Sequence, residues 1–338
     1  EISECLVGSE MCIRDRSYYE EIHPFLEKKA KELGYEVTYD RKRTGYITLE
    51  GEDNSKTVCM GAHLDTIGLI VRHITDEGHL EVRQLGGINY SSIEGEGVTI
   101  HTRDGRKYRG MVICKSHSVH VFDDARTAPR DELHMEVILH EDVKSKEDVM
   151  NLGIDHGDVI SIDPHFEYTP SGYVKSRFID DKAAVAALFE MIAYFKRNNL
   201  KPKYRTLLAF PLYEEIGHGG AYVPEEVSEY VALDIGLIGP DYHGNETTVS
   251  ICAKDNYSPY DRGLTNRIIL QAKKANLNYC VDVFYRYGTD ANAAIRAGNN
   301  VYAAAFGMAC INSHGMERCH ISAIEETAKL AIAYALDI

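Results

Sequence analysis

The centre of the chain holds two adjacent glutamates, Glu214 and Glu215, between an apolar run and a glycine-rich turn. The run RTLLAFPL at 205–212 predicts a buried strand that ends just before them. Burying two carboxylates together costs free energy unless cations or protons compensate for their charge. An exposed turn is the alternative, but it fits poorly with so apolar a strand. Adjacent acids suit a hydrolytic site in which one carboxylate binds a metal ion and the other activates water.

A histidine and an aspartate two residues apart follow an earlier strand-like segment, TVCMGAH at 57–63. Because an extended backbone places alternate side chains on the same side, His63 and Asp65 are expected to point the same way. The histidine can then bind a metal ion while the carboxylate orients an imidazole from behind. Alone, this spacing is weak evidence for a metal site.

Three more candidate ligands lie where other predicted elements begin or end. Asp180 stands with Asp181 at the start of an alanine-rich helix, where the alternative is a pair of acids that complement the helix dipole. Asp234 lies at the tip of the apolar strand YVALDIG, and His314 precedes the last helix. His320, at the start of that helix, fits capping or packing better than metal binding.

These groups together predict a site for two metal ions. Imidazole and carboxylate bind divalent zinc, cobalt and manganese, and two close ions usually share a bridging carboxylate. Side chains at the ends of neighbouring strands converge over one edge of a sheet. In chain order the candidates form the pattern H-x-D, D, E-E, D, H.

That order resembles the glutamyl aminopeptidase and tetrahedral aminopeptidase family of dinuclear metallopeptidases (metallopeptidase family forty-two, clan MH). The resemblance extends from about residue 17 to the C-terminus and includes a β-rich insertion between the first two ligand motifs. The segment Gly288-Thr289-Asp290-Ala291 is similar to the G-T-D-A segment of that family. The resemblance therefore implies a substrate-binding role for Gly288, Thr289 and Asp290.

The resemblance also implies a role for each residue of the metal site. Five protein ligands hold two ions: Asp180 as the bridge, His63 and Asp234 at one ion, and Glu215 and His314 at the other. Zn²⁺ is the expected metal, with Co²⁺ or Mn²⁺ as alternatives. Glu214 is the general base that passes a proton from water to the leaving amine, and Asp65 braces His63.

Three details depart from the commoner family pattern. Tyr213 precedes the paired glutamates where glutamine is usual, and His218 follows them where a small or apolar residue is usual. The last ligand lies in S-H-G-M-E-R at 313–318 in place of I-H-S-P. These changes bear on the specificity pocket more than on the metal centre.

The pattern of predicted elements indicates an α/β protein with an insertion. Residues 17–72 and 165–338 alternate strands and helices, which predicts a three-layer αβα metallopeptidase domain. Residues 73–164 contain short alternating runs typical of a small β-barrel or sandwich. The resemblance implies that this insertion is a PDZ-like barrel that supports dimer contacts, within assemblies from dimer to dodecamer. Residues 1–16 fit nothing that follows and resemble translated sequencing adaptor.

Composition excludes several classes of function. The net charge is −15, and the one short basic cluster, at 41–43, fits a solvated turn, so no nucleic-acid surface is expected. No apolar run approaches the ~20 residues that cross a bilayer. The eight cysteines include no C-x-x-C pair, which argues against zinc-thiolate sites and favours a reducing, cytoplasmic location.

The sequence thus predicts an aminopeptidase that acts on peptides through two metal ions and Glu214. The first alternative is a related hydrolase of a small acylated or capped dipeptide of the osmolyte type, with the same metals and base but another pocket. The second alternative is a non-catalytic, metal-stabilised binding or scaffold protein. In such a protein we would expect one of the metal ligands or the base to be replaced, and all of them are present. A cellulase activity is disfavoured because the chain has no tryptophan to stack on sugars.

Overall fold

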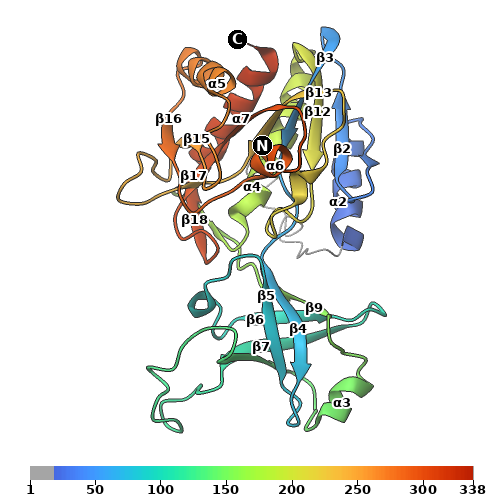
Figure 1. Ribbon diagram of the computed structural model, residues 1–338, viewed down its shortest axis with the longest axis vertical. Coiled ribbons are helices and arrows are strands. Elements are labelled where there is room, and N and C mark those ends of the chain that lie inside the picture. The colour runs from blue at the N-terminus through green and yellow to red at the C-terminus, as the bar shows by residue number, and fades with distance from the viewer. Residues whose placement is uncertain (1–18, 338) are drawn as a thin grey trace. The chain divides into compact units, whose positions relative to one another are not determined.

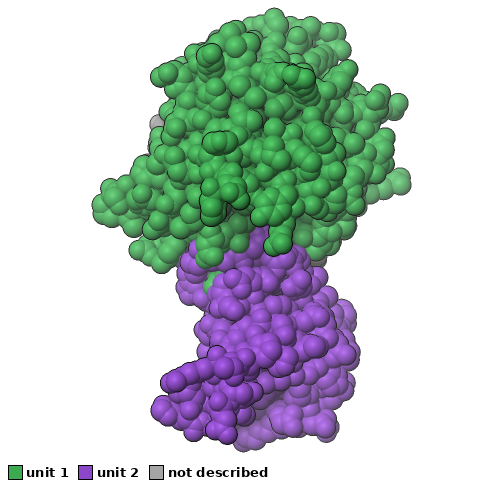
Figure 2. Space-filling model, turned by 60° about the vertical axis from the view of Figure 1, so that its left-hand side comes forward, with its two compact units in different colours: residues 1–65, 166–313, 317–338 green, residues 66–165, 314–316 purple. Residues whose placement is uncertain are grey.

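The computed structural model describes residues 19–337, so the adaptor-like segment 1–16 lies outside the described residues. This part of the chain forms two compact units (Figure 2). The first contains residues 19–65, 166–313 and 317–337. The second contains residues 66–165 together with 314–316.

Within the described residues, the first unit is built on a nine-stranded mixed sheet (Figure 1). Its strands, in spatial order, are β1 (Thr38–Tyr39), β2 (Gly45–Leu49), β12 (Tyr204–Phe210), β3 (Asp53–Gly61), β13 (Val227–Leu233), β17 (Tyr302–Cys310), β15 (Val249–Lys254) and β16 (Tyr279–Val283), with β14 (Gly236–Leu237) beside β17. The four central strands β12, β3, β13 and β17 run parallel to one another. Their carboxyl ends therefore meet at one edge of the sheet.

Helices cover both faces of this sheet. One face packs against α2 (Tyr19–Glu32), α4 (Ile179–Asn198), α5 (Arg262–Lys274) and α7 (Ile321–Leu336), and the other packs against α6 (Asp290–Arg296). Alternate side chains along each strand point to opposite faces of the sheet and so pack into two separate hydrophobic cores. In β3, Val58 and Met60 face the first core and Cys59 faces the second. This arrangement confirms the predicted three-layer α/β domain.

The second unit is a closed barrel. Its strands, in order around the barrel, are β4 (Gly68–Ile74), β5 (Leu80–Leu85), β8 (Met135–Leu139), β7 (Lys107–Cys114), β6 (Gly97–His101) and β9 (Val159–Ile162). All neighbours are antiparallel, and alternate residues such as Leu80 and Val82 are fully buried. The unit also contains η1 (Tyr90–Ser92) and α3 (Lys146–Asn151). The predicted β-barrel insertion is confirmed.

A small sheet and a short helical turn complete the first unit. The sheet consists of β10 (Glu167–Tyr168), β11 (Tyr173–Ser176) and β18 (Glu317–His320), and the turn is η2 (Gly219–Ala221). His320 caps α7 by accepting the Ser322 N–H at Nδ1, as the capping interpretation predicts. Among residues 19–337, no helix has the length and apolar character needed to cross a bilayer.

Candidate metal centre

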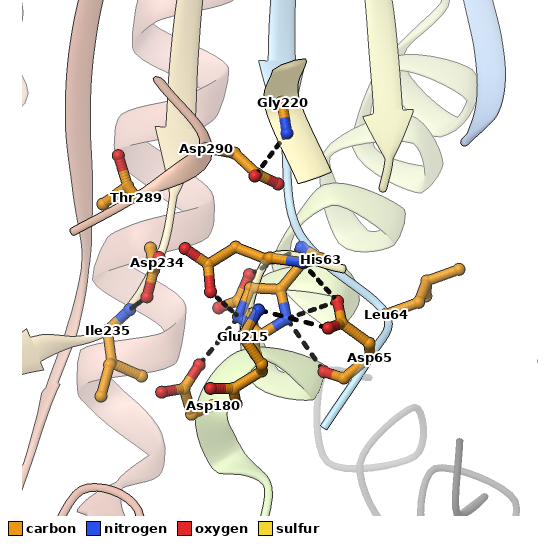
Figure 3. A network of polar contacts seen from close by, with 12 residues as sticks. His63, Leu64, Asp65, Asp180, Glu215, Gly220, Asp234, Ile235, Thr289 and Asp290 are labelled. Atoms are coloured by element: carbon orange, nitrogen blue, oxygen red, sulfur yellow. Dashed lines mark hydrogen bonds and ion pairs between the residues drawn. The ribbon is translucent and has the colours of Figure 1, made fainter. Parts of the chain in front are cut away.

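Four of the five candidate ligands, His63, Asp180, Glu215 and Asp234, gather at the carboxyl edge of the parallel strands (Figure 3). His63 lies two residues beyond the end of β3, and Asp234 follows β13 directly. Glu214 and Glu215 follow β12 after a short turn at Tyr213, whose φ is +72°. In open α/β sheets this edge is where ligands bind.

His63 turns one ring nitrogen toward its own strand end and the other toward the acids. Its Nδ1–H donates to the Asp65 carbonyl oxygen at 2.9 Å. Its Nε2 lies 3.0 Å from Asp180 Oδ1 and 3.8 Å from a carboxylate oxygen of Glu214. Fixing Nδ1 in this way leaves Nε2 free to bind a cation, which is how metal-binding histidines are oriented.

Around that nitrogen the structure brings together three overlapping groups of possible ligands. The ligand atoms within each group all lie within 4.8 Å of one another. The groups are His63, Asp180 and Glu215; His63, Glu214 and Asp234; and Asp180, Asp181 and Asp234. Four of the five predicted ligands and the predicted base are therefore close neighbours.

The acids are too crowded to carry their charges without cations. Burial, followed by the neighbouring carboxylates, raises the pKa of Asp181, of Glu214 and of Asp234 well above the ordinary range. Burial alone lowers the pKa of His63, but hydrogen bonds to Asp180 and Asp65 raise it well above its ordinary value. Divalent cations bound among these carboxylates would compensate for the crowded charges. The residues present suit a pair of such ions.

Asp65 does more than the predicted bracing of His63. Its carboxylate lies 3.5 Å from His63 Nδ1. The same carboxylate accepts the backbone N–H of Glu214 at 3.1 Å and that of Glu215 at 3.2 Å. Asp65 therefore links the histidine to the turn that carries both glutamates.

Two functional residues were missed by sequence reasoning. Asp181, interpreted only as a possible helix-start acid, accepts the backbone N–H of His63 at 3.1 Å through Oδ2, and its Oδ1 has no hydrogen-bond partner among the described residues. Glu317, buried in β18, accepts the backbone N–H of Asp180 at 3.0 Å. The signal for Glu317 was present, because it lies three residues beyond His314 in the S-H-G-M-E-R motif.

His314 is not part of the three groups of ligands. It belongs to the second unit, where its Nδ1–H donates to the Gly87 carbonyl oxygen at 2.6 Å. Its backbone is left-handed, with φ of +61°. Its role as the fifth ligand stays a prediction.

The G-T-D segment lies beside the same edge of the sheet. Thr289 caps α6 by accepting the Ala291 N–H, and its hydroxyl lies 2.6 Å from that of Tyr260. Asp290 accepts the Gly220 N–H at 2.5 Å (Figure 3). A side chain at Gly288 would meet the Tyr257 ring, since a Cβ there would lie 2.9 Å from it.

Two of the departures from the family pattern contact each other. The rings of Tyr213 and His218 stack with centroids 5.0 Å apart. Lys42, from the basic turn, donates to His218 Nδ1 at 2.9 Å, and its ammonium lies 5.8 Å from the centre of the Tyr213 ring. Only part of that turn is therefore solvated as predicted: Arg41 and Arg43 are exposed, while Lys42 is half-buried.

The fold and these ligands define a class of metal-dependent hydrolases, and comparison with known proteins gives the family. The family model for M42 glutamyl aminopeptidase matches residues 44–330. The YhfE protein of Bacillus subtilis is 39% identical over 315 residues, which cover 93% of this chain and 91% of YhfE. The glutamyl aminopeptidase of Lactococcus lactis is 22% identical over 204 residues, 60% of this chain and 56% of that enzyme. The chain belongs to the M42 glutamyl aminopeptidase family and is a metallo-aminopeptidase, a hydrolase of peptide bonds.

Solved structures confirm the fold. An aminopeptidase from the archaeon Desulfurococcus kamchatkensis matches with a TM-score of 0.88 at 19% identity, covering 100% of this chain and 96% of that one. The TET1 peptidase of Pyrococcus horikoshii matches with a TM-score of 0.86 at 24% identity over the full length of both chains. Identities this low show a shared architecture only.

Proposed function

We propose that this enzyme removes N-terminal residues from peptides by means of two divalent ions, with Glu214 as the general base. The observation that carries the proposal is the group of buried and partly buried carboxylates around His63 Nε2, whose mutual repulsion bound cations would relieve. Asp180, which belongs to two of the three groups of possible ligands, is assigned as the bridge. His63 and Asp234 complete one metal site, and Glu215 with His314 the other.

Both glutamates lie within reach of possible metal ligands, Glu214 with His63 and Asp234 and Glu215 with His63 and Asp180, so the division of labour between them rests on the family pattern. In that pattern the second glutamate binds a metal, and Glu215 lies close enough to Asp180, the assigned bridge, to do so. Glu214 is almost buried, and burial raises its pKa, which suits a group that takes a proton and gives it back. Divalent ions, when bound, polarise the scissile carbonyl and acidify water. Glu214 then accepts the proton from the attacking water and delivers it to the leaving amine.

Zn²⁺ is the proposed metal, although the imidazole and carboxylate ligands also suit Co²⁺ and Mn²⁺. Gly288, Thr289 and Asp290 are proposed to form one wall of the substrate site, because the Asp290 carboxylate is close enough to His63 and Asp65 for their charges to act on it. A free α-amino group binds on this side of the metals.

The alternative substrate is a small acylated or capped dipeptide. One panel of substrates separates the two: aminoacyl p-nitroanilides with a free amine, their N-acetyl derivatives, and short capped dipeptides, each assayed with Zn²⁺, Co²⁺ and Mn²⁺. The proposal predicts turnover of the free-amine compounds and at least about tenfold slower turnover of acylated ones. Preference for the acylated or capped compounds would establish the alternative instead.

A cytoplasmic homo-oligomer is proposed for the working enzyme. The six cysteines within the described residues are free and buried, which suits a reducing compartment. The TET1 peptidase of Pyrococcus horikoshii can assemble into a tetrahedron or a large octahedral shell. The barrel unit of this chain exposes Val119, Val121 and Leu133, apolar side chains that association between copies could cover. Light scattering of the purified protein tests this, and a monomer at micromolar concentration would contradict it.

A further inference from the structure

Asp290 presents a carboxylate that the metal centre does not use. It is the first residue of α6 and only 4% of it is exposed. Its Oδ1 accepts the Gly220 N–H, and a Cβ at Gly219 would lie 2.5 and 2.6 Å from the two carboxylate oxygens. The Asp290 carboxylate therefore fills the space beside the glycine turn that a side chain at Gly219 would need.

The second oxygen of Asp290 has nothing to bind. Among residues 19–337, Oδ2 has no hydrogen-bond partner. The charges of His63 and, more weakly, of Lys42 act on Asp290, but neither side chain is hydrogen-bonded to it: His63 is bonded to Asp65 and Asp180, and the Lys42 ammonium to His218. A buried carboxylate without a cation is costly, and such oxygens are normally paired or ligand-binding. Burial raises the pKa of Asp290 to about 7, in keeping with a missing partner.

The charge around Asp290 selects for a cation. The charge of Asp65 acts on Asp290, and the charge of Asp290 acts on Glu214. Two divalent ions cannot neutralise all the carboxylates gathered here, which are Asp65, Asp180, Asp181, Glu214, Glu215, Asp234 and Asp290. Asp290 is not among the possible metal ligands, so ions bound by those ligands do not use its carboxylate.

We infer that Asp290 Oδ2 binds the protonated α-amino group of the substrate, an inference that rests on the proposed aminopeptidase function. An α-ammonium is a compact cation with three N–H donors and is largely protonated near neutral pH. Binding it at this oxygen fixes the first residue of a peptide against the metal centre. An acylated amine carries no charge and has a single N–H, so it cannot replace the ammonium. Asp290 would thus determine that the enzyme acts on free N-termini.

Calorimetry with paired inhibitors tests the inference without turnover. The probes are an amino acid hydroxamate and its deamino analogue, titrated into metal-loaded wild type and Asp290→Asn. We expect Asp290→Asn to lower the affinity for the amine-bearing hydroxamate about 10- to 100-fold, because a charge-assisted hydrogen bond is lost. The affinity for the deamino analogue should stay unchanged. Asp241→Asn, at an exposed position, is the matched control and should change neither.

Two results would overturn the inference. Equal weakening of both hydroxamates would mean that Asp290 is sealed from the substrate and supports the metal centre only. Unchanged binding of both would mean that the amine binds elsewhere. Failure of the proposed function is distinguishable, because it would appear as an inactive wild type toward all free-amine substrates, whatever the calorimetry shows. Equal metal content in wild type and Asp290→Asn verifies that the centre is intact.

Discussion

Glu317 and Asp180 lie 137 residues apart in the sequence, yet Glu317 Oε2 accepts the Asp180 backbone N–H at 3.0 Å. The same oxygen accepts the Phe178 N–H at 3.4 Å. Phe178 and Asp180 are not helical, although they stand where α4 begins: Phe178 is left-handed, with φ of +96°, and Asp180 has an extended ψ of 105°. Glu317 therefore holds the irregular turn that presents the proposed bridging carboxylate.

Replacing Glu317 should loosen that turn and weaken metal binding. We expect Glu317→Ala to lower metal affinity or kcat about 10- to 100-fold, the usual effect of removing a group that orients a ligand. Glu317→Gln keeps an acceptor oxygen, so its metal affinity and kcat should fall less than those of Glu317→Ala. Arg318→Ala, which breaks an exposed ion pair with Glu246 in the same motif, is the control. Calorimetric metal titration decides, and identical metal binding in wild type and Glu317→Ala would contradict the role.

Metal removal should destabilise the whole first unit. Without cations the buried acids repel one another or must take up protons, whereas bound ions stabilise only the folded state. We expect chelated protein to melt at a lower Tm and to regain stability on titration with two equivalents of Zn²⁺. Each ion contributes about 2.7 kcal/mol when present at a hundredfold excess over its Kd. A Tm that does not change on chelation would contradict a metal site. Full recovery of the Tm at one equivalent of Zn²⁺ would contradict a site for two ions.

Far from the site, a buried acid should make stability depend on pH. Burial raises the pKa of Glu229, but hydrogen bonds from Arg267, Lys56 and Tyr334 outweigh burial and hold the pKa below its ordinary value. A carboxyl with a lowered folded-state pKa stabilises the protein above its unfolded-state pKa, and this stability is lost as the pH falls through the folded-state value. Glu229→Gln should therefore cost about 2–3 kcal/mol at pH 7. The difference from wild type should shrink below about pH 4.

Urea unfolding at pH 7 and at pH 3.5 measures that difference. Glu226→Gln, at an exposed position nearby in the sequence, provides the matched control. A Glu229→Gln deficit that is the same at both pH values would show that the side chain acts through packing and not through its charge.

The sequence predicted the elements and the ligands that follow local rules. The alanine-rich helix, the apolar strands and the acids at their ends are visible because burial and periodicity leave a pattern within a few residues. The contact of Glu317 with Asp180, and that of Lys42 with His218, depend on segments brought together only by the complete fold. Asp181 was undervalued because an acid at the start of a helix has an ordinary capping explanation.

The central claim is that Glu214 moves the proton while its neighbours hold the metals. The most direct test is single-turnover hydrolysis of the best aminoacyl p-nitroanilide by Glu214→Gln, with metal content measured on the same sample. The account predicts full metal occupancy with turnover reduced at least about 10²- to 10⁴-fold, because Gln cannot accept the proton. Near-normal turnover at full occupancy would contradict it.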